Sequence, residues 1–277
     1  MFKKMSGIIS LLLFIALIGI CFVGFKKDKS QRVDLLAKRD AYNETVKKED
    51  NKNEKVDKKG DEKKETEESP KKENVSVEDK IKEMTILTLG DGTSKDGLYQ
   101  EKLKKMINPK DIVNKANSGL QIKTMASAAD ENSIKSSNVI LIHCGINDYT
   151  KSLEIGNIND SKEVESYYGN LKYLTESIKA INPEGIIILM TPQKHGFVEG
   201  QPSYPDPNYL GYTLDDYASA ILKYGETNSI PVIDLFNESG IESANISEYT
   251  IDNLTLNESG ATKIATLISE KFKTIIK

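Results

Sequence analysis

Residues 138–145 read NVILIHCG, a short apolar run that ends in glycine. Such a run, without alternation between apolar and polar residues, is typical of a strand that is buried on both faces of a sheet. Four other segments share this pattern to different degrees. The five strands that the sequence predicts cover residues 84–90, 111–117, 138–145, 185–190 and 231–236.

The segments between these strands repeat apolar residues at the spacing of a helix. This spacing begins with Leu98, Leu103, Met106 and Ile107. The other predicted helices cover residues 121–129, 164–181, 214–224 and 261–276. Alternating strands and helices indicate a three-layer α/β/α fold, in which helices cover both faces of a five-stranded parallel sheet. In such a fold the ligand site lies outside the carboxyl ends of the strands.

The composition excludes several classes of protein. Only 38% of the 277 residues are hydrophobic, so some segment outside the folded domain must dilute the apolar content. Two cysteines exclude a disulfide scaffold, and two histidines leave little room for a histidine-based metal site. The net charge of −4 argues against a nucleic-acid partner. We therefore expect no metal, no other cofactor and no nucleic acid.

The N-terminal residues 1–25 predict a membrane anchor. Residues 7–25 read GIISLLLFIALIGICFVGF, carry no charge and match the roughly 20 residues of a spanning helix. A cleaved signal peptide is the main alternative, but we find no convincing cleavage site after a shorter apolar core. Lipid attachment at Cys21 is disfavoured because Ile20 precedes it, where a small residue is expected.

Residues 26–82 predict a disordered linker, because their charged and polar side chains cannot bury enough apolar area to fold. The lysines that follow the anchor oppose an outside orientation by the positive-inside rule. A tether that carries one domain is nevertheless a common surface layout. We therefore expect a single-pass cell-membrane protein whose domain, residues 83–277, is extracytoplasmic. That domain has 26 acidic and 18 basic residues, a net charge of −8.

Four polar blocks follow the predicted strands or precede the last helix. They read GDGTS at residues 90–94, NSG at 117–119, GIND at 145–148 and DNLTLNESG at 252–260. Together and in this order they resemble the SGNH (GDSL-type) hydrolase family. The resemblance covers essentially all of residues 83–277 and implies the flavodoxin-like fold of that family.

The resemblance also implies roles for single residues. In this family the first block supplies a nucleophilic serine, and the last block supplies the acid and the base as Asp-x-x-His. Gly92 stands at the serine position and Thr255 at the histidine position, whereas Asp252 keeps the acid. Gly119 and Asn147 match the residues that help to form the oxyanion hole. We expect Gly92 and Thr255 to line the same ligand-binding site.

A relocated pair could replace the missing catalytic groups. Ser94 lies two residues beyond Gly92, and His195 follows the fourth predicted strand at the same sheet edge, so Ser94 and His195 are a candidate nucleophile and base. In the simpler interpretation, Ser94 caps the following helix and His195 contacts ligand or solvent without catalysing. His143 and Cys144 are expected to be buried in the third strand.

The loop at residues 193–212 reads QKHGFVEGQPSYPDPNYLGY. It is longer than the roughly 2–6 residues of an ordinary strand-to-helix connection. Its aromatic residues could stack against sugar rings, or the loop could be a disordered excursion.

These observations lead to three hypotheses. The first is a catalytically degenerate hydrolase-like protein that binds or helps to process cell-envelope glycans or acylated ligands. The second is an active esterase or acyltransferase, acting on carbohydrate or lipid O-acyl groups through Ser94 and His195. The third is a non-catalytic surface scaffold. The absence of both a nucleophile at residue 92 and a base at residue 255 favours the first, because acyl transfer needs an activated nucleophile.

Overall fold

The computed structural model describes residues 76–276. The predicted anchor and most of the predicted linker lie outside these residues. The end of that linker is folded, because Val77–Lys82 form helix α2. The Ser76 hydroxyl caps α2 by accepting a hydrogen bond from Asp79 N, and Ile81 is buried. Within the described residues no helix is both long enough and apolar enough to cross a membrane.

The centre of the domain is a parallel sheet. Its strands are β1 (Thr85–Gly90), β2 (Asp111–Asn114), β3 (Val139–His143), β4 (Ile186–Met190) and β5 (Val232–Ile233). They lie in the order β2-β1-β3-β4-β5, and every neighbouring pair is parallel. Gly90, His143 and Met190 are paired across β1, β3 and β4, so these strands end at the same level. This confirms the predicted five-stranded parallel sheet.

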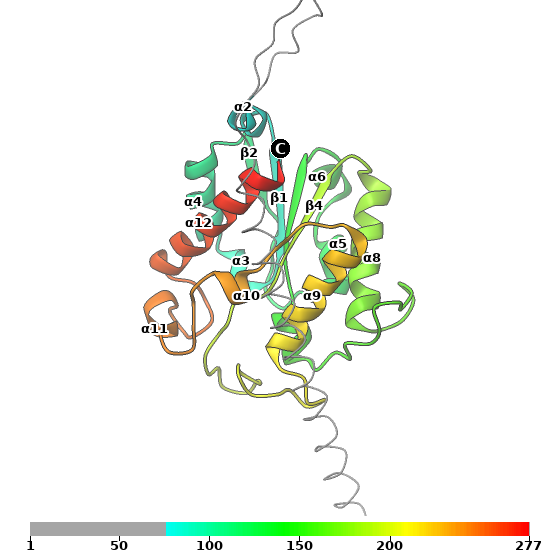
Figure 1. Cartoon of the computed structure of the whole chain (residues 1–277), viewed down its shortest axis with the longest axis vertical. Coiled ribbons are helices and arrows are strands. Elements are labelled where there is room, and N and C mark those ends of the chain that lie inside the picture. The colour runs from blue at the N-terminus through cyan, green and yellow to red at the C-terminus, as the bar shows by residue number, and fades with distance from the viewer. Residues whose placement is uncertain (1–75, 277) are drawn as a thin grey trace, which may run out of the picture. The chain divides into compact units, whose positions relative to one another are not determined.

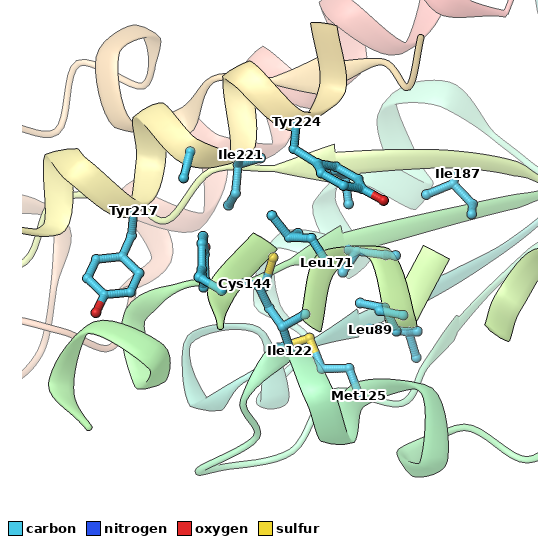
Figure 2. Packing of buried hydrophobic residues seen from close by; sticks show 14 of the residues in the cluster. Leu89, Ile122, Met125, Cys144, Leu171, Ile187, Tyr217, Ile221 and Tyr224 are labelled. Atoms are coloured by element: carbon cyan, nitrogen blue, oxygen red, sulfur yellow. The ribbon is translucent and has the colours of Figure 1, made fainter. Parts of the chain in front are cut away.

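Helices cover both faces of the sheet (Figure 1). One layer contains α5 (Ile122–Ala128), α8 (Tyr167–Ile181) and α9 (Leu214–Asn228), and the other contains α4 (Leu98–Ile107) and α12 (Glu258–Ile275). Alternate strand residues point to the two layers: Ile140 and Ile142 of β3 belong to the first core, and Leu141 to the second. Figure 2 shows the first core, where apolar side chains of the helices pack against the strands. The predicted three-layer α/β fold is therefore confirmed.

Strand β5 is much shorter than predicted. The sequence pattern predicts a strand through Phe236, but the strand ends at Ile233. The Asp234 carboxylate accepts a hydrogen bond from Asn237 N at 3.1 Å and caps helix α10 (Leu235–Glu238). The apolar residues after Asp234 are buried in a helix, and burial alone does not distinguish a short helix from a strand.

Two other predicted strands also end early. β2 ends at Asn114, although Lys115 N and Asn117 N still donate hydrogen bonds to carbonyl groups of β1 at 2.9 and 3.0 Å. β3 ends at His143, and the backbone of Gly145 then turns with a φ of 118°. The left-handed turn leads directly into a short helix.

The long predicted helices are present with shifted ends. α8 begins at Tyr167, later than predicted, because the Ser166 hydroxyl accepts a hydrogen bond from Gly169 N at 3.1 Å and caps the helix there. α12 begins at Glu258, earlier than predicted, after the side chain of Asn257 caps it. These caps explain why the apolar period alone misplaces the helix ends.

Several short helices were not predicted. They are α3 (Gly92–Lys95), α6 (Glu131–Lys135), α7 (Ile146–Thr150) and α11 (Ile246–Tyr249). Each spans about one turn, which is too short to show a helical period. α3, α7 and α10 follow β1, β3 and β5, so they lie at the carboxyl edge of the sheet. α2 precedes β1 and lies at the opposite end (Figure 1).

Candidate functional site

The loop after β1 carries Gly92 at the position of the family's serine, within contact distance of Ser118. Gly92 is the first residue of α3, and Asp91 caps this helix by accepting hydrogen bonds from Thr93 N at 2.9 Å and Thr93 Oγ1 at 2.7 Å. A Cβ atom added to Gly92 would have Ser118 Oγ as its nearest neighbour, at 3.6 Å. This is an ordinary contact distance, so the backbone would accept a Cβ atom here without rearrangement.

The two residues at the oxyanion positions, Gly119 in a turn and Asn147 on helix α7, belong to segments that are hydrogen-bonded to each other. Asn147 Nδ2, on α7, donates a hydrogen bond to the Leu120 carbonyl at 3.0 Å. Lys151 Nζ donates to the Gly119 carbonyl at 3.0 Å. Gly119 itself has a φ of 78°, a conformation that favours glycine. The structure therefore brings the Gly119 loop and Asn147 together, as the resemblance implies.

A buried carboxyl group holds the same loop from behind. The backbone N–H of Ile122 points at both oxygens of Asp148, at 3.4 Å each. The pKa of Asp148 is raised to about 7, mainly by desolvation and also by the nearby Asp91 charge, against the lowering effect of the Ile122 N–H. Near neutral pH this carboxyl group is therefore partly protonated.

The loop before α12 replaces the family's acid–base contact by an Asp–Thr contact. Asp252 accepts hydrogen bonds from Thr255 N at 2.6 Å and from Thr255 Oγ1 at 3.0 Å. Partial burial opposes ionisation of Asp252, but the hydrogen bonds from Thr255 and Leu254 prevail and lower its pKa. A threonine hydroxyl cannot accept a proton near neutral pH. The acid is thus in place, with no base attached to it.

Ser94 is paired with the histidine of β3. Ser94 Oγ lies 2.8 Å from His143 Nδ1, and Thr93 Oγ1 lies 3.3 Å from the same nitrogen. Ser94 and His143 are both buried. Burial lowers the pKa of His143, although the Asp91 charge raises it in part. The burial expected for His143, and for Cys144 beside it, is confirmed.

The suggestion that Ser94 caps a helix is wrong. Ser94 lies within α3, whose cap is Asp91, and α4 begins after Gly97, which makes no side-chain cap. The Ser94 hydroxyl instead faces His143, and its carbonyl accepts a hydrogen bond from Gln100 Nε2 at 2.9 Å. The role of Ser94 in this structure is internal.

His195 lies beside the loop of Asp252 but is not joined to Ser94. His195 is buried, and its Nδ1 lies 3.0 Å from the Gly196 carbonyl. Gly196 N donates a hydrogen bond to the Asn253 carbonyl at 2.8 Å, which fixes His195 near the acid loop. Among residues 76–276, His195 Nε2 has no hydrogen-bond partner, and no hydrogen bond connects Ser94 with His195. Burial lowers the pKa of His195, so the ring is neutral at pH 7.

The long loop at residues 193–212 is held in place by Asn208. The Asn208 amide donates hydrogen bonds to the Tyr149 carbonyl and to Tyr217 Oη, both at 3.0 Å. The loop is therefore not a disordered excursion. Two of its aromatic side chains point into solvent: Phe197 is 73% exposed and Tyr209 is 92% exposed. They are available for contacts with a ligand.

Two residues of the site were missed by the sequence reasoning. Ser118 is exposed and faces the space at Gly92, and Lys151 supports the Gly119 loop. The position of Ser118 directly before Gly119 is the only sequence signal that could have indicated it. Across residues 76–276, no group of three or more His, Cys, Asp or Glu side chains is arranged to hold a metal ion.

A family model matches most of the domain. Residues 85–263, more than half of the chain, match the model of the GDSL-like lipase/acylhydrolase family. The chain belongs to this family. No curated protein sequence matches it significantly.

Solved structures share the fold of this GDSL-like domain. A possible lipase from Chitinophaga pinensis is 21% identical, with a TM-score of 0.59, and the match covers 70% of this chain and 99% of the other. A lipase/acylhydrolase from Enterococcus faecalis is 18% identical, with a TM-score of 0.51 and coverage of 70% and 97%. A family 3 carbohydrate esterase from Clostridium thermocellum is 16% identical, with a TM-score of 0.50 and coverage of 70% and 98%.

Proposed function

We propose that this GDSL-like domain binds acylated cell-envelope carbohydrates and has little or no hydrolytic activity by the usual mechanism of its family. The observation that carries the proposal is the geometry at residues 92 and 255. Gly92 has no side chain at the nucleophile position. The Thr255 hydroxyl donates a hydrogen bond to Asp252, the acid that would orient a histidine in the family. The loops that would bind an ester oxygen, those of Gly119 and Asn147, remain connected.

The choice of ligand class rests on two observations. The family acts on acyl groups, and a carbohydrate esterase is among the proteins that share the fold. Exposed aromatic rings such as those of Phe197 and Tyr209 are suited to stack on sugar rings. An acylated carbohydrate would use both the oxyanion loops and the aromatic side chains.

The alternative of an active esterase with a relocated Ser94–His195 pair is less well supported. Ser94 is buried and its hydroxyl contacts His143, so a substrate carbonyl could reach it only after α3 moved. The third possibility is a surface scaffold, which requires no ligand at the candidate site.

In this proposal the anchor predicted at residues 7–25 attaches the protein to the cell membrane with the domain outside. α2 enters the domain at the amino end of β1, whereas the loops of the site lie at the carboxyl ends of the strands.

The proposal is tested by binding and turnover in the same sample. Full-length protein in detergent is titrated with acetylated xylo-oligosaccharides in a calorimeter, with the deacetylated oligosaccharides as control, and released acetate is measured afterwards. We expect binding that depends on the acetyl groups, with no acetate release above the buffer rate. Acetate release that disappears in Ser94→Ala would support the relocated pair instead.

A further inference from the structure

The space left by the missing nucleophile is bordered by another hydroxyl group. The three atoms nearest to a Cβ added at Gly92 all belong to Ser118: Oγ at 3.6 Å, Cα at 3.8 Å and Cβ at 3.9 Å. A serine hydroxyl at residue 92 would project from that Cβ. Ser118 therefore borders the space in which the family's nucleophile would lie.

The Ser118 hydroxyl is available to a ligand. Ser118 is exposed, and within residues 76–276 its Oγ makes no hydrogen bond, whereas the hydroxyls of Thr93 and Ser94 are both engaged with buried groups. Its backbone follows directly on a contact with the sheet, since Asn117 N donates a hydrogen bond to the Gly90 carbonyl of β1 at 3.0 Å. The exposed hydroxyl thus makes no hydrogen bond to any other residue in the range 76–276.

The neighbouring residue leaves room for a ligand to approach. A Cβ added at Gly119 would have no atom within 4 Å. The loop is held from the other side by Asn147 and Lys151, through the carbonyl groups of Leu120 and Gly119. A ligand that lies over Gly92 and Gly119 would therefore meet the Ser118 hydroxyl without any rearrangement of the loop.

We propose that the Ser118 hydroxyl binds the ligand where the family's serine is missing. It would donate a hydrogen bond to a neutral oxygen of the ligand, such as an ester carbonyl. This inference rests on the proposed function and specifies which group recognises the acyl oxygen. The role is binding and not bond breaking. Asp252 is engaged by Thr255, His143 by Ser94, and His195 is buried, so none of them is set to take a proton from Ser118.

The test compares Ser118→Ala with the wild type in the same titration with acetylated xylo-oligosaccharides, using the full-length chain. We expect about 3- to 10-fold weaker binding, the loss typical of one hydrogen bond. Ser127→Ala is the matched control, because Ser127 is an exposed serine of α5 whose hydroxyl bonds only the Thr124 carbonyl. This control should bind like the wild type. Equal thermal unfolding of the variants excludes a folding defect.

A second variant tests the shared space. Adding Gly92→Ser to Ser118→Ala places a hydroxyl on the opposite side of the same opening, and we expect it to restore most of the lost affinity. Undiminished binding by Ser118→Ala, or a loss that Gly92→Ser does not recover, would overturn the role of Ser118 and leave the proposed function standing. A wild type that does not bind the acetylated probe would overturn both. Acetate release that requires Ser118 would overturn its assignment as a binding group.

Discussion

Near enough to Asp91 to feel its charge lies a group of buried titratable side chains that favour their neutral forms. Desolvation raises the pKa of Asp148 and lowers those of His143 and His195, in each case against the charged state. A charge buried without a partner costs several kcal/mol, so the cheaper solution is to remain neutral. The residues that resemble catalytic groups by type are thus mainly part of the packing beneath the site.

The raised pKa of Asp148 makes a prediction for stability. Its folded-state pKa is about 7, against 3.8 for an ordinary aspartate, so the folded protein holds an extra proton between about pH 4 and 7. The stability that this proton contributes is present below pH 4 and is lost as the pH rises to 7. Asp148→Asn cannot lose a proton. In urea unfolding between pH 4 and 8, the stability of Asp148→Asn relative to wild type should rise by about 1.4 kcal/mol per pH unit inside the window.

A difference between Asp148→Asn and wild type that stays constant from pH 4 to 8 would show that the carboxyl group titrates normally. The histidines do not produce the same signal. Their lowered pKa values make both proteins less stable as the pH falls below about 6.5, and this effect cancels in the difference.

At the scale of elements, short helices at the strand ends position the site. α7 carries Asn147 and Asp148, and it begins directly after Gly145, whose φ is 118°. A Cβ added at Gly145 would lie 2.8 Å from Tyr167 Oη and 3.2 Å from Pro192. Both the backbone angle and the close packing therefore require glycine at this turn.

Gly145→Ala should lower the free energy of unfolding by about 3 kcal/mol, since backbone strain and a steric overlap add together. Gly200→Ala is the matched control: Gly200 has a φ of 81°, but its added Cβ would meet no atom within 4 Å. This control should lose only about 1–2 kcal/mol, the cost of the left-handed conformation alone. Chemical denaturation measures both values, and equal losses would contradict the packing argument.

At the scale of the whole molecule, the sequence predicts the three layers of the fold but not the residues at which the strands end at the carboxyl edge of the sheet. The apolar runs around Ile86, Ile140 and Ile188 identify central strands, because the residues that point to either face of these strands are buried. The end of β5 at Ile233 could not be predicted, because it depends on one hydrogen bond from Asn237 N to the Asp234 carboxylate. Local caps of this kind do not change the apolar period.

The candidate site was predicted in part, for the same reason. Gly119 and Asn147 could be assigned because they belong to motifs with fixed spacing, and the structure brings their loops together. The contact of Ser94 with His143 could not be predicted, because it joins residues 49 positions apart through side-chain packing. Ser118 was overlooked because its importance depends on the absence of a side chain at Gly92.

The central proposal is that this GDSL-like domain keeps the contacts between α7 and the Gly119 loop and lacks only the family's nucleophile and base. The direct measurement is the hydrolysis of short-chain aryl esters by the double variant Gly92→Ser with Thr255→His. A Cβ added at residue 92 would have its nearest neighbour at 3.6 Å, and residue 255 already contacts Asp252. Gly92→Ala with Thr255→His is the control without a hydroxyl. We predict turnover at least about 100-fold above wild type for the double variant and none for the control. Equal rates in the wild type and the double variant, or a high rate in the wild type itself, would contradict this account.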